Sequence, residues 1–193
     1  MGAARDRILA TACDLFYREG IRAVGIDRII AEAGVAKASL YANFSSKDDL
    51  IVAYLAYLRD VWQAEVDAEL AGIDDPVEAI RRLFELLGDD FGDVAFRGCP
   101  FGNAAAEFPD RSHPSRRVTD AYRSWLRQRL AGLAGAAGLE DPPAVATALV
   151  LVYDGACVGA KLDDADAVRA ATLAAVDEIV DGARRADVAK VAK

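Results

Sequence analysis

Apolar residues recur at helical spacing along most of the chain, most clearly between Gly20 and Leu50. A first stripe, with members three or four residues apart as on one face of a helix, consists of Ile26, Ile29, Ile30 and Ala33. Gly34 follows directly and can adopt the left-handed backbone that ends a helix. A second stripe belongs to a helix that is too short to be stable without packing, and consists of Val35, Leu40 and Phe44. The pattern predicts a helix-turn-helix whose short second helix presents its other face outward.

The rest of the chain predicts an all-α fold of about nine helices, because glycine and proline are confined to breaks and no stretch alternates strictly between polar and apolar residues. We expect a three-helix head over residues 1–46. A helix over residues 47–70, about 36 Å long at 1.5 Å per residue, should connect this head to a larger helical body over residues 47–185. Residues 186–193 are expected to form a frayed tail.

The last two predicted helices, over about residues 142–162 and 165–184, carry small and apolar residues on shared faces. Small residues four apart, such as Gly155 and Gly159, let another helix approach closely. Two such helices from each of two chains could form a four-helix bundle, whereas the alternative is that they only fill the body's own core. The residues expected at a dimer interface are Gly155, Val158, Gly159, Val168, Thr172, Ala175, Val176 and Ile179.

The net charge of −8 argues against a general nucleic-acid coat protein. Residues 1–50 contain seven basic and seven acidic residues, so the whole net charge lies in the body and the neutral head alone could dock on DNA. The N-terminus carries no signal-peptide core, and the longest strongly apolar stretch, Ala144–Tyr153, meets Asp154 before it could cross a membrane. We therefore expect a cytoplasmic protein without a membrane partner.

The sequence offers no reactive constellation for an enzyme. It has a single histidine, His113, and we find no glycine-rich phosphate loop, nucleophile elbow or metal-ligand spacing, so we expect no catalytic residues, cofactor or metal site. Cys13, Cys99 and Cys157 are too widely spaced for a disulfide framework or a zinc motif. Cys99 has two interpretations: a thiol activated at a helix start, which could sense electrophiles or oxidants, or a small buried hydrophobic residue.

The helix-turn-helix region resembles the N-terminal DNA-binding head of the TetR (TetR/AcrR) family of transcriptional regulators. The resemblance covers roughly the first quarter of the chain and rests on Ile29, Glu32-Ala33-Gly34-Val35, Lys37, Leu40-Tyr41, Phe44, Ser46-Lys47 and Asp49-Leu50. It implies a homodimer that binds a palindromic double-stranded DNA operator, most simply as a repressor, and that pairs through its last two helices. The expected DNA contacts, made by the outward face of the short helix and by flanking polar residues, are Arg28, Lys37, Ala38, Ser39, Tyr41, Ala42, Asn43 and Lys47.

TetR-like bodies hold an effector pocket among the helices that here carry most of the aromatic residues. A largely apolar pocket with a few polar groups would suit a small lipophilic or aromatic effector. The default role of each aromatic residue is core packing. The residues expected to line the pocket are Trp62, Phe84, Leu87, Phe91, Cys99, Phe101, Asn103, Phe108, Tyr122, Trp125, Tyr153 and Asp154.

Two alternatives remain beside a ligand-released repressor. One is an electrophile-sensing or redox-sensing regulator of the same fold, triggered at Cys99. The other, of a different class, is a helical ligand-binding or scaffold protein with a degenerate DNA-binding head. The scaffold alternative is based on Val24, Gly25 and Ala36. The family usually has hydroxyl residues at these positions, which would cap a helix and contact a phosphate.

Overall fold

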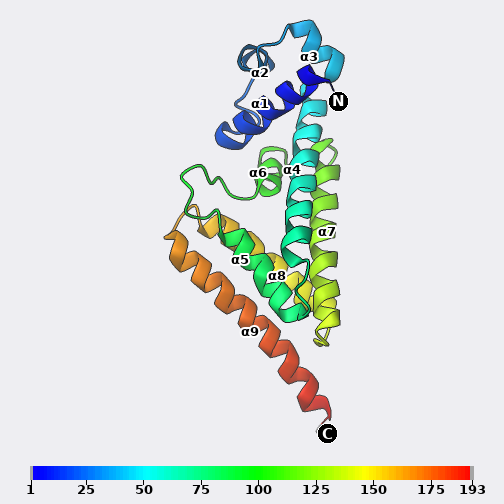
Figure 1. The fold of residues 1–193 in the computed structure, drawn as a ribbon, viewed down its shortest axis with the longest axis vertical. Helices are drawn as coiled ribbons and strands as arrows, with labels where there is room; N and C mark the ends of the chain where they lie inside the picture. The colour runs from blue at the N-terminus through cyan, green and yellow to red at the C-terminus, as the bar shows by residue number, and fades with distance from the viewer. Residues whose placement is uncertain (1, 192–193) are drawn as a thin grey trace. The chain divides into compact units, whose positions relative to one another are not determined.

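The computed structural model describes the backbone of residues 2–191 and the side chains of residues 2–184. Over these residues the chain is all-α, as the sequence predicts, and contains nine helices (Figure 1). They are α1 (Ala3–Glu19), α2 (Ile26–Ala33), α3 (Lys37–Asn43), α4 (Lys47–Leu70), α5 (Pro76–Gly88), α6 (Pro100–Glu107), α7 (Ser115–Ala136), α8 (Pro142–Gly159) and α9 (Ala165–Val191). The frayed tail predicted over residues 186–193 falls outside the part whose side chains are described.

The chain forms two compact units. The first combines Met1–Val61 with Pro100–Tyr122, and the second combines Trp62–Cys99 with Arg123–Lys193. The first unit is larger than the head expected over residues 1–46, because it also holds the first part of α4, all of α6 and the start of α7. The unit boundary therefore falls inside two continuous helices, α4 and α7.

The first unit is built on contacts among α1, α2 and α3, which Figure 1 shows grouped together. Their apolar stripes meet in a core that contains Ile8, Leu15, Phe16, Ile29, Leu40 and Phe44, all buried. Gly34 ends α2 in the left-handed conformation, with φ 61°. A residue with a side chain is usually strained at positive φ. Glycine has no side chain and therefore suits this turn.

The second unit packs α9 against α5 and α8, and α5 against α8 (Figure 1). Its core is apolar and includes Ile80, Leu83, Phe84, Leu149, Val150, Tyr153, Val176 and Val180. The rings of Phe84 and Tyr153 meet edge to face with their centroids 6.4 Å apart. An aspartate carboxylate caps the start of each of these three helices. Asp75 accepts the Val77 amide at 2.9 Å, Asp141 accepts the Ala144 amide at 3.2 Å, and Asp164 accepts the Ala167 amide at 2.9 Å.

By length and composition, α8 is apolar enough to cross a membrane, and 39% of its Pro142–Gly159 segment is buried by the rest of the chain. The sequence expectation ended the apolar stretch at Asp154, but α8 continues through that residue. The Asp154 carboxylate is paired with the guanidinium of Arg123 on α7, which compensates its charge. The helix otherwise has the contacts of a body helix, on α5 and α9.

Candidate functional site

The outward face of α3 is the candidate DNA-reading surface. Tyr41 is 47% exposed, whereas Leu40, its neighbour in the chain, is fully buried and fixes the helix to the head. The other expected contact residues on this helix, all exposed except the half-exposed Ser39, are Lys37, Ala38, Ser39, Ala42 and Asn43. A short helix held by one buried face and open on the other can enter a major groove, which is the geometry that a helix-turn-helix requires.

Two of the expected cationic contacts are already paired with acids of the head. The Arg28 guanidinium donates to Glu32 Oε1 at 2.8 Å and to Glu19 Oε1 at 2.8 Å. The Lys37 ammonium lies 3.1 Å from Asp27 Oδ1. Hydrogen bonds to Glu19 and then Glu32 raise the pKa of Arg28, and the hydrogen bond to Asp27 raises the pKa of Lys37. Both side chains are therefore charged but locally neutralised before any DNA arrives.

Asn43 and Lys47 also have partners within the head. The Asn43 side-chain amide donates to the Ser39 backbone carbonyl at 2.8 Å, which closes the last turn of α3. The Lys47 ammonium lies 5.8 Å from the centre of the Phe16 ring, and burial lowers its pKa. Lys47 stands at the start of α4, where the Ser46 hydroxyl accepts the Asp49 amide at 3.1 Å. The helix expected over residues 47–70 therefore has the predicted bounds.

The positions that lack the family's usual hydroxyl groups differ in their surroundings. Val24 is fully buried, so its side chain belongs to the head's core. Gly25 and Ala36 are the N-cap residues of α2 and α3, and neither makes a side-chain cap. Their backbone carbonyls still accept helix amides, from Ile29 at 3.3 Å and from Leu40 at 3.2 Å. Both helices therefore start without side-chain caps.

A carboxylate from α6 holds the turn between α1 and α2, all within the first unit. Glu107 Oε1 accepts the Ile21 amide at 3.0 Å, and its Oε2 accepts the Arg22 amide at 2.7 Å. The Arg22 guanidinium donates to the Glu107 carbonyl at 3.3 Å and lies over the Phe108 ring. Sequence reasoning missed this contact, because the partners are 86 and 85 residues apart and no local pattern links them.

The twelve residues expected to line an effector pocket are divided between the two units. Phe101, Asn103, Phe108 and Tyr122 belong to the first unit, and the remaining eight belong to the second. In the first unit, Phe101 stacks on Tyr122 at 3.8 Å between ring centroids, and Phe108 stacks on His113 at 4.0 Å. In the second, Phe84, Leu87, Phe91 and Tyr153 are buried, while Trp62, Cys99, Trp125 and Asp154 are half-buried. Several of these aromatic rings thus have core partners within their own unit.

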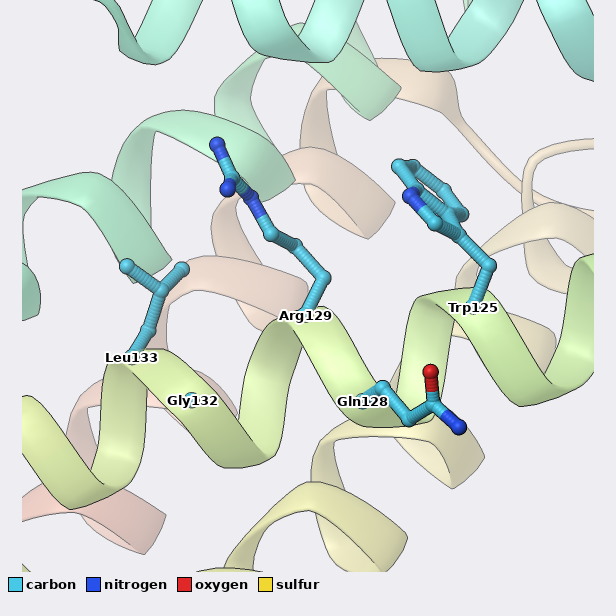
Figure 2. Close-up of a pocket in the computed structure, with 5 residues that line it drawn as sticks. All are labelled: Trp125, Gln128, Arg129, Gly132 and Leu133. Carbon is cyan, nitrogen blue, oxygen red and sulfur yellow. The ribbon is translucent and has the colours of Figure 1, made fainter.

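A cavity of about 350 Å³ opens along α7 in the second unit, and Figure 2 shows its lining. The lining residues are Trp125, Gln128, Arg129, Gly132 and Leu133, of which only Trp125 was expected from the sequence. Trp125, Arg129 and Leu133 point to the same side of the helix (Figure 2). Arg129 Nη2 lies 3.2 Å from Asp67 Oδ1. The other members could have been found from the sequence, because all five recur at the three-to-four-residue spacing of one helix face.

The expected dimer residues fall into two groups. Thr172 and Val176 are buried, and the methyl groups of Val168 lie 3.4 and 3.5 Å from the place where a Cβ on Gly159 would stand. These positions therefore pack α9 onto α8 within the chain. Gly155 and Val158 face outward, while Ala175 and Ile179 are half-buried. Val158 is 51% exposed. Leu151 and Leu162, which were not expected at the interface, are 64% and 76% exposed.

Comparison with known proteins identifies both parts of the chain. Residues 8–54 match the family of bacterial regulatory proteins called the tetR family, and residues 76–176 match the C-terminal domain of LmrA/YxaF-like transcriptional regulators. The regulator YxaF of Bacillus subtilis (strain 168), itself uncharacterized, is 32% identical over 127 residues, which are 64% of this chain and 66% of YxaF. The regulator LmrA of the same organism is 30% identical over 127 residues, which are 64% of this chain and 68% of LmrA. The matched region thus spans about two thirds of each relative.

Solved structures agree over almost the whole chain. A TetR-family transcriptional regulator from Streptomyces coelicolor superposes with a TM-score of 0.88 at 38% identity, covering 93% of this chain and 95% of that one. A second regulator, from Streptomyces avermitilis, gives a TM-score of 0.87 at 29% identity over 95% of this chain and 99% of that one. These relatives are regulators of transcription and not enzymes. The chain therefore belongs to the TetR family of transcriptional regulators, with a DNA-binding helix-turn-helix head and an LmrA/YxaF-like C-terminal domain.

Proposed function

We propose that this regulator is a cytoplasmic repressor, which binds a palindromic operator as a homodimer and is released by a small lipophilic or aromatic molecule. Residues 1–46 bind DNA in this proposal, and residues 47–185 carry the effector site and the dimer contact. The observation that carries it is the outward face of α3, on which Tyr41 is half-exposed beside small and polar residues while Leu40 anchors the helix. Tyr41 would donate to a phosphate, and Lys37 and Lys47 would neutralise phosphates.

A homodimer accounts for the apolar outer face of α8. Leu151, Gly155 and Val158 are exposed at helical spacing on that face, and Leu162 is exposed in the turn after the helix. The outer face of α9 adds small residues that would let a second helix approach closely, namely Ala167, Ala170, Ala171 and Ala174. A dimer that buries this surface presents two recognition helices, as a palindromic operator requires.

The cavity on α7 supports an aromatic or lipophilic effector. Trp125 and Leu133 offer apolar surface, while Gln128 and Arg129 offer a few polar groups that would orient a ligand. Release follows if the effector binds more tightly to a body conformation in which the two heads no longer match successive major grooves. Only this difference in affinity between the two conformations can drive release.

Anisotropy titration against fragments of DNA flanking the protein's own gene tests the proposal. The titration is run at two salt concentrations with excess unrelated DNA. We expect saturable binding of a dimer to one near-palindromic fragment, which weakens as salt rises. Tyr41→Phe and Lys37→Ala should weaken that binding, whereas Arg127→Ala, which removes an exposed cation from α7, should leave it unchanged. If neither these fragments nor sequences selected from random DNA are preferred over the competitor, the head is degenerate and the scaffold alternative holds.

A further inference from the structure

Two cysteines from distant parts of the sequence lie together in the second unit. Cys99 is the residue directly before α6, and Cys157 lies on α8. The backbone amide of Cys99 donates a hydrogen bond to the Cys157 thiol. The neighbouring Gly98 has φ 81°, and a Cβ there would stand 3.1 Å from the Cys157 carbonyl oxygen. The segment before α6 therefore runs directly against α8 at Cys157.

This placement brings the two sulfur atoms within reach of each other. Because the Cys157 sulfur accepts a hydrogen bond from the Cys99 amide, it lies against the backbone of Cys99. A disulfide needs the two Cβ atoms about 3.5–4.5 Å apart and the Cα atoms about 4.4–6.8 Å apart. Because the Cys157 sulfur already contacts the main chain of Cys99, the two cysteines are close to these distances. Rotation of the Cys99 side chain brings the Cys99 sulfur toward the Cys157 sulfur.

The surroundings give the two thiols different reactivity. Cys157 is buried, and its pKa is raised first by burial and then by the negative charges of Cys99 and Asp154, so it is protonated at neutral pH. Cys99 is only half-buried. The Lys161 side chain lies close by, with Cδ and Cε 3.2 and 3.3 Å from the place where a Cβ on Gly98 would stand, and its charge offsets a small part of the rise in the pKa of Cys157.

We propose that Cys99 and Cys157 form an intramolecular disulfide when the protein meets a hydroperoxide. The Cys99 thiolate attacks the outer peroxide oxygen, the O–O bond breaks, and the departing alkoxide or hydroxide takes a proton, which leaves a sulfenic acid on Cys99. The negative charge of Cys99 is then gone, so Cys157 ionises more easily. The Cys157 thiolate attacks the Cys99 sulfur, and hydroxide leaves and becomes water. In total, the two thiols lose two electrons and two protons. One organic hydroperoxide becomes one alcohol and one water, and one hydrogen peroxide becomes two waters.

The disulfide would act on the DNA-binding head through the chain itself. Cys99 is bonded to Pro100, the first residue of α6, and Glu107 at the other end of this helix holds the turn after α1. Fixing Cys99 on α8 restrains the start of α6 and biases the state of that turn. This regulatory part rests on the proposed function as a DNA-binding repressor, whereas the disulfide itself does not.

The chemical part is tested by treating the reduced full-length protein with a small excess of hydrogen peroxide, followed by mass spectrometry without reductant. We expect the loss of two hydrogen atoms and a peptide linked between Cys99 and Cys157. Cys13→Ser, the matched control, should behave like the wild type. Cys157→Ser should stop at a Cys99 sulfenic acid that dimedone traps, and Cys99→Ser should not react. Cys157→Ala is a second variant at the same position, and circular dichroism of each variant shows whether it folds. Together they distinguish a folding defect from loss of disulfide formation. A link between other cysteines, a link between chains, or unchanged Cys99 and Cys157 thiols would overturn the proposal.

The regulatory part is tested by operator anisotropy on the same samples. Oxidised wild type and Cys13→Ser should bind the operator about tenfold more weakly than the reduced proteins, a change typical of allosteric coupling, and reductant should restore binding. Equal operator affinity before and after the disulfide forms would overturn the regulatory part. Failure of the reduced protein to bind any operator contradicts the proposed repressor instead, and the mass measurement distinguishes the two results.

Discussion

At the scale of single residues, the pairing of Lys37 with Asp27 competes with the phosphate contact that we propose for Lys37. In that proposal a phosphate displaces the Asp27 carboxylate, which lies 3.1 Å from the ammonium. We predict that Asp27→Asn tightens operator binding by about threefold to tenfold at low salt and steepens its salt dependence by less than about one in log–log slope. Asp74→Asn makes the same charge change in an exposed loop of the body and should have no effect. Equal affinities of wild type and Asp27→Asn would mean that Lys37 does not meet a phosphate.

A second residue-scale effect concerns alkaline stability. Burial raises the pKa of Cys13 to about 12 from its usual value of 9.0, so above that usual value the unfolded chain loses this proton while the folded chain keeps it. The free energy of unfolding should therefore fall as pH rises through the window from about 9 to 12, with a contribution of up to about 1.4 kcal/mol per pH unit from this thiol. Urea unfolding at pH 8, 9 and 10 measures the effect. Cys13→Ala removes one such thiol, so a slope identical to that of the wild type would contradict the assignment.

At the scale of elements, the contact between α6 and the turn after α1 is the part of the head most sensitive to one substitution. Glu107→Ala leaves the Ile21 and Arg22 amides without their acceptor, and Ile21 is almost completely buried. We predict a loss of about 1–2 kcal/mol in the free energy of unfolding and faster hydrogen exchange at these two amides. Glu78→Ala, an exposed change on α5, is the matched control. Unchanged exchange at Ile21 would show that the turn holds its shape without α6.

The elements themselves follow from local signals, and their partners do not. Gly34 after an apolar stripe marks a helix end in the sequence, and it serves that role in the structure. By contrast, Thr172 and Val176 look equally suited to a dimer face or to the body's own core, and only the packing of α9 on α5 and α8 decides that they are buried. The Glu107 contact is likewise invisible to any local pattern, because it joins segments 85 or more residues apart.

At the scale of the whole molecule, charge alone gives this regulator little attraction for DNA. Residues 1–50 carry equal numbers of acids and bases, and the net charge of −8 lies in the remainder. Arg28 and Lys37 are further engaged by acids of the head itself. In the proposed homodimer, we therefore expect affinity for an operator to come mainly from the joint binding of two heads to two half-sites. DNA binding should therefore depend strongly on the dimer.

Val158→Glu tests this dependence, because Val158 lies near the end of α8 on its exposed apolar face and is 51% exposed. A half-exposed residue can accept a charge without harm to the fold, but two such charges facing each other in a dimer would be desolvated and would repel. We predict a monomer in analytical ultracentrifugation, an unchanged circular dichroism spectrum and operator binding weakened by at least about tenfold. Val94→Glu places the same charge on a fully exposed valine outside the helices and should remain dimeric with full affinity. A Val158→Glu protein that stays dimeric would place the interface elsewhere, and a monomer with undiminished affinity would show that one head suffices.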